Sequence, residues 1–421
     1  MTEKNAKPQL RFAGFDDTWE QRKLGEVLIS LQNNTLSRAD LSSEEGIAKN
    51  IHYGDILVKF GEVIDLKTES LPMIADETVI AKYKSSFLQN GDVIVADTAE
   101  DETVGKCTEI AGLSDEIVIS GLHTIPYRPL QKYAPGYLGY YMNSASFHNQ
   151  LLPLMQGIKV TSISKTALQN TDILYPKSAT EQAAIGKYFR NLDNLITLHQ
   201  RKYDKLTNVK KSMLEKMFPK NGSNVPEIRF KGFSDAWEQR KVGELLIERN
   251  EQAPMNEEYP LMAFIANEGV APKGERYDRS SLVTDTENKL YKRTEFGDFI
   301  YSSNNLETGS IGLNKYGKAC ISPVYSIFHP TGIADSNFLG RRLVRKDFIN
   351  SMVKWRQGVI YGQWRIHESD FLKIEISVPS VKEQRQIGTF LDYLDNLITL
   401  HQRELEKLKN LKKACLEKMF V

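Results

Sequence analysis

The strongest constraint on this chain is an internal duplication. Residues 10–28 read LRFAGFDDTWEQRKLGEVL and residues 228–246 read IRFKGFSDAWEQRKVGELL, so 13 of 19 positions are identical at an offset of 218. Residues 181–218 and 383–420 agree at 24 of 38 positions at an offset of 202, and both contain LDNLITLHQR (192–201 and 394–403). The chain therefore repeats one plan, and its fold must satisfy that plan twice.

The segments between these repeats differ in length and sequence. Gln21 and Glu181 lie 160 positions apart, whereas Gln239 and Glu383 lie 144 apart. Only short turn-to-strand pieces align, such as GDVI at 91–94 and GDFI at 297–300. Two near-identical frames thus carry two dissimilar inserts. This pattern favours inserts with different tasks; unequal drift of surface-rich segments is the alternative.

Each strong repeat predicts one long helix. The S-x-x-E pairs Ser178/Glu181 and Ser380/Glu383 predict capping boxes at the helix starts. Residues 179–218 would span about 60 Å at a rise of about 1.5 Å per residue. Apolar residues that alternate in steps of four and three predict a coiled-coil seam in both helices: Ile185, Phe189, Leu192, Ile196, His199, Tyr203 and Leu206, and Ile387, Leu391, Leu394, Ile398, His401, Leu405 and Leu408. The duplication favours antiparallel pairing of these two helices within one chain, and an intermolecular seam is the alternative.

Six seam residues are candidates for spacing and for contacts with partner proteins: Leu192, Ile196, His199, Leu394, Ile398 and His401. The two histidines occupy equivalent positions, which raises the possibility of a metal pair or a pH switch. No cysteine or acidic residue accompanies them in the seam. A polar residue that sets the helix register is therefore the favoured interpretation, and we expect no metal site.

The inserts predict mixed domains of strands and helices. In the first, we expect strands at Ile56–Phe60, Val93–Ala96, Ile117–Ser120 and His123–Tyr127, then a helix that ends at Gln156-Gly157. In the second, we expect strands at Leu261–Ile265, Phe299–Ser302 and Pro323–Phe328, then a helix from about Lys346 to Gln357-Gly358. The expected fold class is α+β: two mixed α/β domains alternate with two long helices that pair as an antiparallel coiled coil, with pseudo-twofold internal duplication. The predicted boundaries are 1–177 and 221–379 for the two domains, here called the first and second heads, and 178–220 and 380–421 for the central and C-terminal spacer helices.

The segments after the two glycine stops hold the best candidates for contacts with nucleic acid. Arg, Lys, Asn and Gln read base edges, and Lys, Arg and hydroxyl groups contact phosphates. The candidates of the first head are Lys159, Thr161, Ser162 and Lys165, with Lys59 as a secondary one. Those of the second head are Tyr361, Gln363 and Arg365, with Asn304 and Asn305 as secondary ones. Ordinary solvated loops are the alternative for any single residue.

Composition limits the compartment and the chemistry. The net charge of +1 means that attraction to phosphate must come from local patches. Scattered cysteines, a polar N-terminus and the lack of a long apolar run predict a cytoplasmic protein. The sequence contains no G-x-x-x-x-G-K-[ST], H-E-x-x-H, G-x-S-x-G or N-P-P-Y motif. We therefore expect a binding protein rather than an enzyme, with no catalytic residues and no cofactor of its own.

The combination of motifs resembles one known family over essentially the whole chain. FxGFxDxWEQRKxGE opens each half, a proline followed by EQxxIG marks the entry to each long helix, and LDNLITLHQR lies within it. This arrangement is similar to the specificity subunit of type I restriction–modification systems. A scaffold protein whose heads bind proteins or sugars is an alternative, and a fused restriction enzyme is disfavoured by the missing motifs.

The resemblance implies a division of labour among subunits. Two target-recognition domains would each read one half of an asymmetric bipartite site in double-stranded DNA, and the paired helices would set the gap. Two modification subunits, which carry S-adenosylmethionine and methylate adenine, would dock on the near-identical helix segments. Restriction subunits would supply ATP- and Mg-dependent translocation and cleavage.

Overall fold

The computed structural model describes residues 7–220, 222–272, 289–360 and 363–421. The chain forms two compact units. One comprises the chain up to Gln200 together with Arg403–Val421, and the other comprises Arg201–Gln402. Each unit thus contains one head, the first part of the long helix that follows it and the end of the other long helix. None of the described helices combines the length and the apolar character that a membrane span requires.

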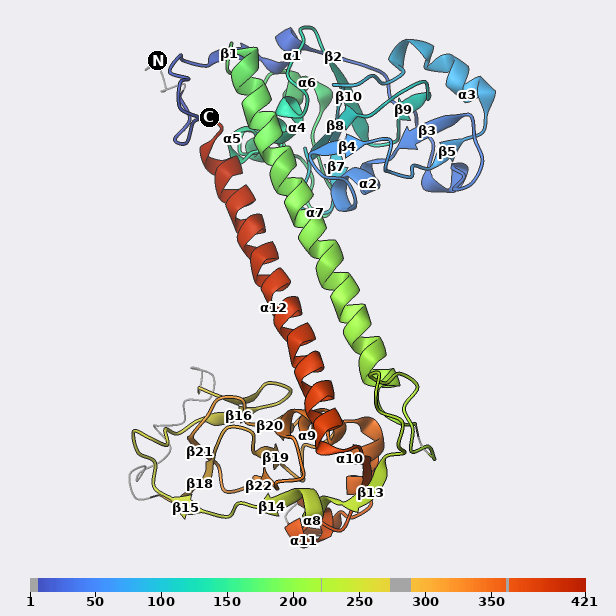
Figure 1. Ribbon diagram of the computed structural model, residues 1–421. Coiled ribbons are helices and arrows are strands. Elements are labelled where there is room, and N and C mark those ends of the chain that lie inside the picture. Colours follow the sequence, from blue (N-terminus) through green and yellow to red (C-terminus); the bar gives the residue numbers. More distant parts are fainter. Residues whose placement is uncertain (1–6, 221, 273–288, 361–362) are drawn as a thin grey trace. The chain divides into compact units, whose positions relative to one another are not determined.

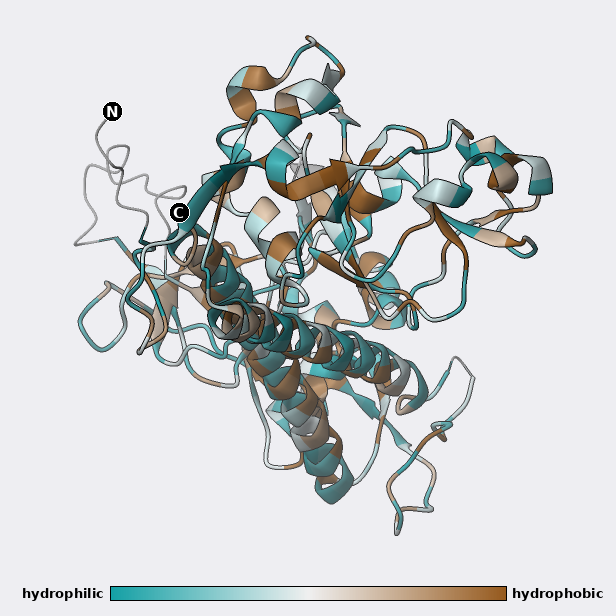
Figure 2. Ribbon diagram, turned by 90° about the horizontal axis from the view of Figure 1, so that it is seen from above, coloured by the Kyte–Doolittle hydropathy of each residue, from teal (hydrophilic) through white to brown (hydrophobic). Residues whose placement is uncertain are grey.

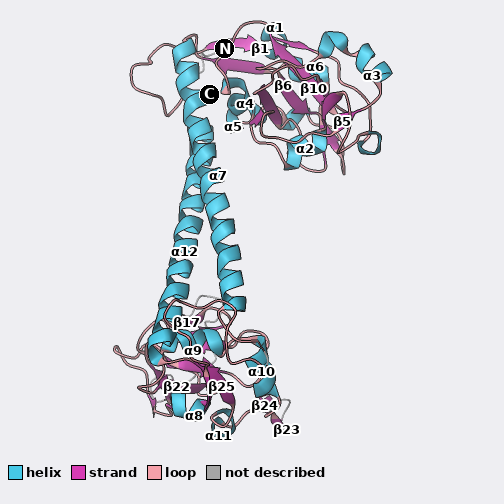
Figure 3. Ribbon diagram, turned by 45° about the vertical axis from the view of Figure 1, so that its right-hand side comes forward, coloured by secondary structure: helices cyan, strands magenta, loops and turns pink. Residues whose placement is uncertain are grey.

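The first head mixes short strands and short helices (Figures 1 and 3). Its strands are β1 (Glu20–Lys23), β2 (Leu28–Ser30), β3 (Ala48–Ile51), β4 (Val63–Asp65), β5 (Met73–Ile74), β6 (Val93–Ala96), β7 (Thr98–Ala99), β8 (Cys107–Ala111), β9 (Val118–Ser120), β10 (Thr124–Pro129), β11 (Thr161–Ser162) and β12 (Asp172–Tyr175). Its helices are α1 (Leu24–Val27), η1 (Arg38–Asp40), α2 (Tyr53–Val58), α3 (Glu77–Lys82), η2 (Lys84–Ser86), α4 (Tyr137–Met142), α5 (Ala145–His148), η3 (Leu152–Leu154) and α6 (Lys165–Gln169). The main sheet has the order β2-β10-β6-β8-β4, in which only β4 and β8 run parallel.

The second head repeats this order with different residues. Its strands are β13 (Glu238–Lys241), β14 (Leu246–Glu248), β15 (Gln252–Ala253), β16 (Ala263–Ile265), β17 (Gly269–Ala271), β18 (Tyr291–Thr294), β19 (Phe299–Tyr301), β20 (Ile311–Leu313), β21 (Ala319–Ile321), β22 (Ser326–Pro330), β23 (Gln357–Ile360), β24 (Gln363–Arg365) and β25 (Glu375–Val378). Its helices are α8 (Val242–Leu245), α9 (Ser336–Arg342), α10 (Lys346–Val353) and α11 (Glu368–Phe371). Its main sheet, β14-β22-β19-β20, corresponds to β2-β10-β6-β8 of the first head.

The two long helices, α7 (Ala179–Lys216) and α12 (Val381–Lys418), confirm that each strong repeat forms one long helix. Within the first unit they run antiparallel, because Tyr188 contacts Cys415 while Asp193, further along α7, pairs with Lys412 at 2.6 Å. In the second unit Lys210 pairs with Asp395. These two ion pairs occupy the same positions of the repeat, since Asp193 and Lys210 correspond to Asp395 and Lys412 at the offset of 202.

The predicted seam begins inside the hydrophobic core of each unit. Its first positions, Ile185, Phe189 and Leu192, are buried in the core of the first head, where Phe189 stacks on Phe420 at the end of α12. In the second unit, Ile387, Leu391 and Leu394 are buried in the same way and Phe218 stacks on Phe338. Apolar and polar residues are interspersed along both helices (Figure 2). Each helix therefore secures a head at its start and another at its end through buried aromatic contacts.

A buried ion pair fixes the start of each long helix. Arg11 donates to both carboxylate oxygens of Glu181, at 2.6 and 2.8 Å, and the Trp19 indole donates to the same carboxylate at 3.3 Å. Arg229 holds Glu383 in the same bidentate way, with both distances 2.7 Å. The two repeats of the sequence, far apart along the chain, are therefore the two sides of one contact. This contact explains why RF at 11–12 and EQ at 181–182 recur together.

The remaining residues of the EQxxIG motif pack the helix against the head. Gln182 accepts from the Ala134 backbone N–H and donates to the Pro176 carbonyl, and Gln384 does the same with Asp335 and Pro379. A Cβ on Gly186 would lie 2.7 Å from the Pro135 carbonyl oxygen. Only glycine allows this close approach of helix and loop.

Several local predictions are wrong. Residues 56–58 lie in helix α2 rather than in a strand. The carboxylates of Glu181 and Glu383 do not complete the predicted capping boxes, because Arg11 and Arg229 bind them; only the bond from the Glu181 N–H to the Ser178 hydroxyl forms, at 3.3 Å.

The two predicted glycine stops are also wrong. Helix α5 ends at His148 and α10 ends at Val353, well before the two glycines. Gly157 and Gly358 instead adopt positive φ angles of 121° and 40° in hairpins, in which Gln156 bridges to Ser162 and β23 pairs with β24. The positive φ requires glycine in both places, but it serves a loop after Gln156 and an irregularity within β23 rather than a helix end.

Removal of the buried carboxylate should destabilise the first unit. We expect Glu181→Ala to cost about 3 kcal/mol, because it leaves the Arg11 guanidinium buried without its partner. Urea unfolding followed by tryptophan fluorescence measures this loss. Glu20→Ala, which breaks the exposed pair with Arg22, is the matched control and should leave the midpoint nearly unchanged. Equal effects of the two substitutions would contradict the assignment.

Glu109 should make the first head less stable as pH rises. It is buried on β8 and accepts bonds from the Gly136 and Gly139 N–H groups at 2.6 and 2.9 Å. Burial raises its pKa from 4.5 to about 7, so between these values the folded chain holds a proton that the unfolded chain has released. Stability is therefore lost as pH rises through this window, by roughly 3 kcal/mol in total. Urea midpoints of Glu109→Gln and of the parent protein, measured from pH 5 to 8, test this. The stability of Glu109→Gln relative to the parent protein should rise with pH up to about pH 7. Parallel profiles would refute the assignment.

Candidate nucleic-acid interface

Each head has a cleft at the same end of its main sheet. In the first head it lies where β6 ends and β10 begins, beside the start of α6, and has a volume of about 550 Å³. In the second head it lies where β19 ends and β22 begins, beside the start of α11, and has a volume of about 770 Å³. The registers Val93↔Tyr127 and Phe299↔Phe328 show that the flanking strands correspond. The duplicated fold therefore places one cleft on each head in equivalent positions.

The cleft of the second head combines cationic, amide and aromatic side chains. Its lining comes from β18, the loop after β19, the start of β22, the β23–β24 hairpin and the start of α11: Lys292, Ser303, Asn304, Pro323, Val324, Tyr325, Ser326, Gln357, Gly358, Trp364, Arg365, Ile366, His367 and Glu368. The Ser303 hydroxyl accepts from the Ile366 N–H at 3.1 Å, which ties the loop to the segment that leads into α11.

The β23–β24 hairpin carries the most exposed of these groups. The Arg365 side chain is 67% exposed and lies 3.8 Å from Glu368. Trp364 is half-exposed, with the Arg356 guanidinium 6.0 Å from its ring. Guanidinium groups and exposed aromatic rings are typical of surfaces that contact nucleic acid.

The cleft of the first head has a different lining: Leu31, Gln32, Asn33, Tyr83, Asp97, Thr124, Ile125, Pro126, Ile163, Ser164 and Lys165. Its only ammonium group among the described lining residues is that of Lys165, at the start of α6. The Asn33 amide donates to the carbonyls of Asn34 and Gly121. The two clefts thus share their place in the fold and differ in their chemistry.

Next to the first cleft, His123 has the left-handed backbone angle φ = 53° in the turn between β9 and β10. Its ring lies 3.3 Å from the Thr98 hydroxyl and 3.5 Å from the Asp97 carboxylate, and it packs edge-on against Tyr53. A positive φ at a residue other than glycine costs free energy and often marks a functional segment.

The structure brings some of the predicted residues of the first head to its cleft. Lys165 lines it, and Thr161 and Ser162 form β11 directly before Ile163. Lys159 is exposed in the loop between Gln156 and Ser162. Lys59 lies elsewhere: it ends α2, donates to the Ser70 carbonyl at 2.9 Å and pairs with Glu69.

In the second head Asn304 and Arg365 line the same cleft, so two residues 61 positions apart in sequence meet there. Asn305 is exposed beside Asn304, and its carbonyl accepts from the Ser310 N–H. Gln363 is the first residue of β24. Tyr361 lies outside the described residues.

Sequence reasoning missed other lining residues. Gln32 and Asn33 follow β2 much as Asn304 and Asn305 follow β19, so the same pattern of amides after a strand could have identified them. Lys292 gave no such signal, because it stands in the polar strand sequence YKRT.

The predicted seam residues lie within the chain's own packing. Leu192 and Leu394 are each 5% exposed in the core of their unit, and the other four candidates, Ile196, His199, Ile398 and His401, are half-buried. The described part of the chain contains no cluster of histidine, cysteine or acidic side chains that could hold a metal ion. Leucines on the outer side of the same repeat are more accessible: Leu195, Leu198 and Leu400 are 44%, 46% and 53% exposed.

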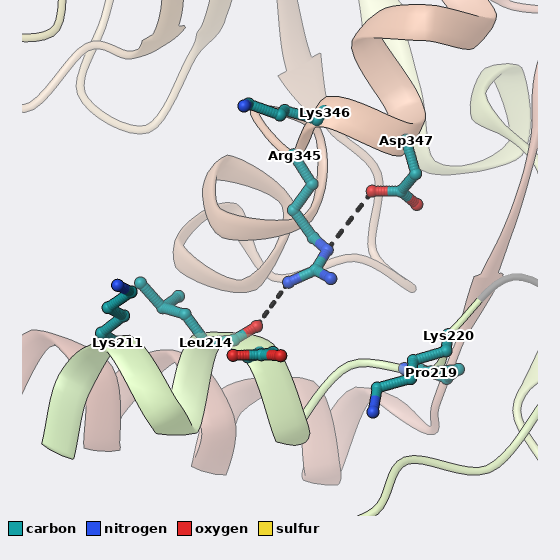
Figure 4. A pocket seen from close by; sticks show the side chains of 8 residues that line it. Lys211, Leu214, Pro219, Lys220, Arg345, Lys346 and Asp347 are labelled. Carbon is teal, nitrogen blue, oxygen red and sulfur yellow. Dashed lines mark hydrogen bonds and ion pairs between the residues drawn. The ribbon is translucent and has the colours of Figure 1, made fainter. Parts of the chain in front are cut away.

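A second pair of equivalent clefts lies where each long helix ends against a head. In the second unit, Arg345 donates to the Leu214 carbonyl at the end of α7 and pairs with Asp347 (Figure 4). This cleft measures about 680 Å³, and that of the first unit, lined by Lys413 and Leu416 of α12 among others, about 550 Å³. Capping of the last carbonyls by a cation stabilises a helix end.

Comparison with known proteins gives a consistent result. Residues 16–208 and 234–410 both match the family described as the type I restriction modification DNA specificity domain. The chain is 24% identical over 418 residues to a putative type I restriction enzyme MjaX specificity subunit of Methanocaldococcus jannaschii, which covers 94% of this chain and 91% of that protein. The fold is similar to the crystal structure of the S subunit of a type I restriction–modification system from M. genitalium. That match has a TM-score of 0.59 and 14% identity and covers 99% of each chain.

Proposed function

Because the chain belongs to the type I restriction–modification DNA specificity family, we propose that its two heads read the two unlike halves of one bipartite site in double-stranded DNA. Members of this family are non-catalytic subunits that supply DNA sequence recognition to a larger complex. Segments 1–177 and 221–379 are the proposed target-recognition domains.

The observation that carries this proposal is the pair of clefts. A duplicated fold gives each head the same recognition position, while the residues that line it differ. Amide, ammonium and guanidinium groups form the hydrogen bonds that distinguish bases in the major groove. Unlike linings therefore support unlike half-sites. The proposed contacts at the clefts are Lys165 in the first head and Asn304 and Arg365 in the second. Five further candidates stay predictions: Lys159, Thr161, Ser162, Tyr361 and Gln363.

The long helices are proposed to hold the gap between the half-sites. Each helix is secured at its start by the buried arginine–glutamate pair and at its end by aromatic stacking, so its length fixes the separation along the chain. Each residue of helix contributes about 1.5 Å to that length.

The reactions are proposed to belong to partner subunits. S-adenosylmethionine, ATP and Mg would be bound by the modification and restriction subunits rather than by this chain. Two equal partners need two equal docking sites, and the duplicated LDNLITLHQR segments provide them. Their outward leucines, Leu195 and Leu198 on α7 and Leu400 on α12, are accessible for such contacts.

Exchange of one head tests the recognition proposal. Residues 221–379 would be replaced by the corresponding segment of a relative, and the chimaera would be produced with its modification partners. Methylation mapping should show a new second half-site and an unchanged first half-site with the same gap. An unchanged site, or a change in both halves, would sink the proposal.

Charge on the outer face of one helix tests the docking proposal. We expect Leu195→Lys with Leu198→Lys to remove one of two modification subunits, because two ammonium groups would interrupt an apolar contact. Native mass spectrometry measures the stoichiometry, which should fall from two copies to one. Leu130→Lys, at a still more accessible leucine of the first head, is the control. Retention of both copies by the double variant would contradict docking at this face.

A further inference from the structure

Lys292 is an enclosed lysine with no ion-pair partner among the residues that the structure describes. It lies in β18, the middle strand of the β15-β18-β21 sheet, is only 7% exposed and lines the cleft of the second head. Its neighbour Arg293 points to the other face of the strand, where it pairs with Glu251 at 2.6 Å and covers the Tyr259 ring. Among the residues that the structure describes, Lys292 forms no ion pair and no side-chain hydrogen bond. Alternation along the strand thus places Arg293 beside an ion-pair partner and Lys292 at the cleft.

The Lys292 side chain is largely enclosed, and no described carboxylate lies within ion-pair distance of its ammonium. Removal of an ion from water carries a penalty of several kcal/mol unless a partner compensates it. Native structures rarely leave buried polar groups without partners. The cleft offers Lys292 a direction in which a ligand could complete its hydrogen bonds.

The nearest acidic group in the cleft is already engaged. Glu368 accepts from the Ser326 hydroxyl at 2.8 Å and lies 3.8 Å from Arg365. Burial favours a raised pKa for Glu368, but its hydrogen bonds and the charges of Lys292 and Arg365 hold the pKa below its ordinary value. The carboxylate therefore stays ionised while shared among several donors. Among the described lining residues, Glu368 is the only carboxylate, beside the two cations Lys292 and Arg365, which suits a ligand that presents acceptors.

This cation belongs to one head only. The position six residues before the corresponding aspartate, Asp298 in the second head and Asp92 in the first, is Ser86 in the first head, where it lies in η2 rather than in a strand. The Ser86 hydroxyl accepts from the Gln32 N–H at 3.0 Å, so a backbone contact takes the place of the ammonium. Phosphates are the same in every half-site, whereas bases differ. A donor that only one head carries therefore favours a base over the DNA backbone.

We propose that Lys292 is a specificity-determining residue of the second head, and that its ammonium donates to the N7 and O6 acceptors of a guanine in the second half-site. This inference rests on the proposed function. A lysine or arginine against the acceptor edge of guanine is the commonest specific contact in the major groove. Asn304 and Arg365, at the rim of the same cleft, would contact neighbouring positions.

The test compares Lys292→Met with Lys289→Met in the full chain, each assembled with its partner subunits. Lys289 is exposed near the start of the same strand, so its substitution removes the same charge outside the cleft. Selection from a DNA library measures the preference at each position. Lys292→Met should lower discrimination for guanine at one position of the second half-site by about tenfold to a hundredfold. The first half-site should not change, and Lys289→Met should match the parent protein.

Four other outcomes have definite meanings. Equal weakening of binding to every sequence, with a salt dependence reduced by about one counterion, would place Lys292 on a phosphate and overturn the proposal. An unchanged guanine preference in Lys292→Met would also overturn the proposal. A retained guanine preference in Lys292→Arg would support the proposal, because it excludes a folding defect as the cause of the loss in Lys292→Met. Failure of the parent complex to select any second half-site would instead overturn the proposed function.

Discussion

The bidentate contact between a buried arginine and a buried glutamate is the constraint on which the rest depends. Arg11 with Glu181, and Arg229 with Glu383, join the opening segment of each half to the first turn of the long helix that closes it. Because a charged pair in low dielectric is strongly destabilised when one partner is lost, neither half of the motif can change alone. The residues between the arginine and the glutamate of each pair form the corresponding head. The frame is therefore fixed by chemistry, while the insert is free to vary wherever it does not touch the clamp, the adjacent glycine or the glutamine beside it.

This separation of frame and insert explains how one architecture can carry two recognition surfaces. The strands β6 and β19, with the aspartates that precede them, are common to both heads, and each aspartate binds an arginine: Asp92 binds Arg128 on β10, and Asp298 binds Arg249 after β14. The arginine thus comes from a different strand in each head, although the aspartate holds the same turn. Beyond these supports the linings diverge, so that position in the fold and chemistry of the surface are set by different residues. The proposed function requires this arrangement, because it assigns equal partners to the repeated helix segments and a different half-site to each head.

Most of the architecture could be predicted from the sequence because duplication and heptad spacing report it directly. The sequence showed that residues 11 and 181 recur together but not that they meet, because contacts between distant segments leave no local periodicity. Gly157 and Gly358 were misread because a positive φ serves a hairpin as readily as a helix end. Asn304 and Arg365 could be nominated by residue type. Lys292 could not, because its significance lies in being buried and unpaired, and burial in a short polar strand depends on what the rest of the chain packs against it.

The central claim is that one chain presents two different recognition surfaces on a repeated frame. Single-molecule sequencing of methylated DNA from a host that expresses this chain with its modification partners tests it most directly. The account predicts one methylated motif with two unlike half-sites separated by a gap of fixed length. Identical half-sites would contradict the claim, because the unlike linings of the two clefts would then have no consequence for the sequence that is read.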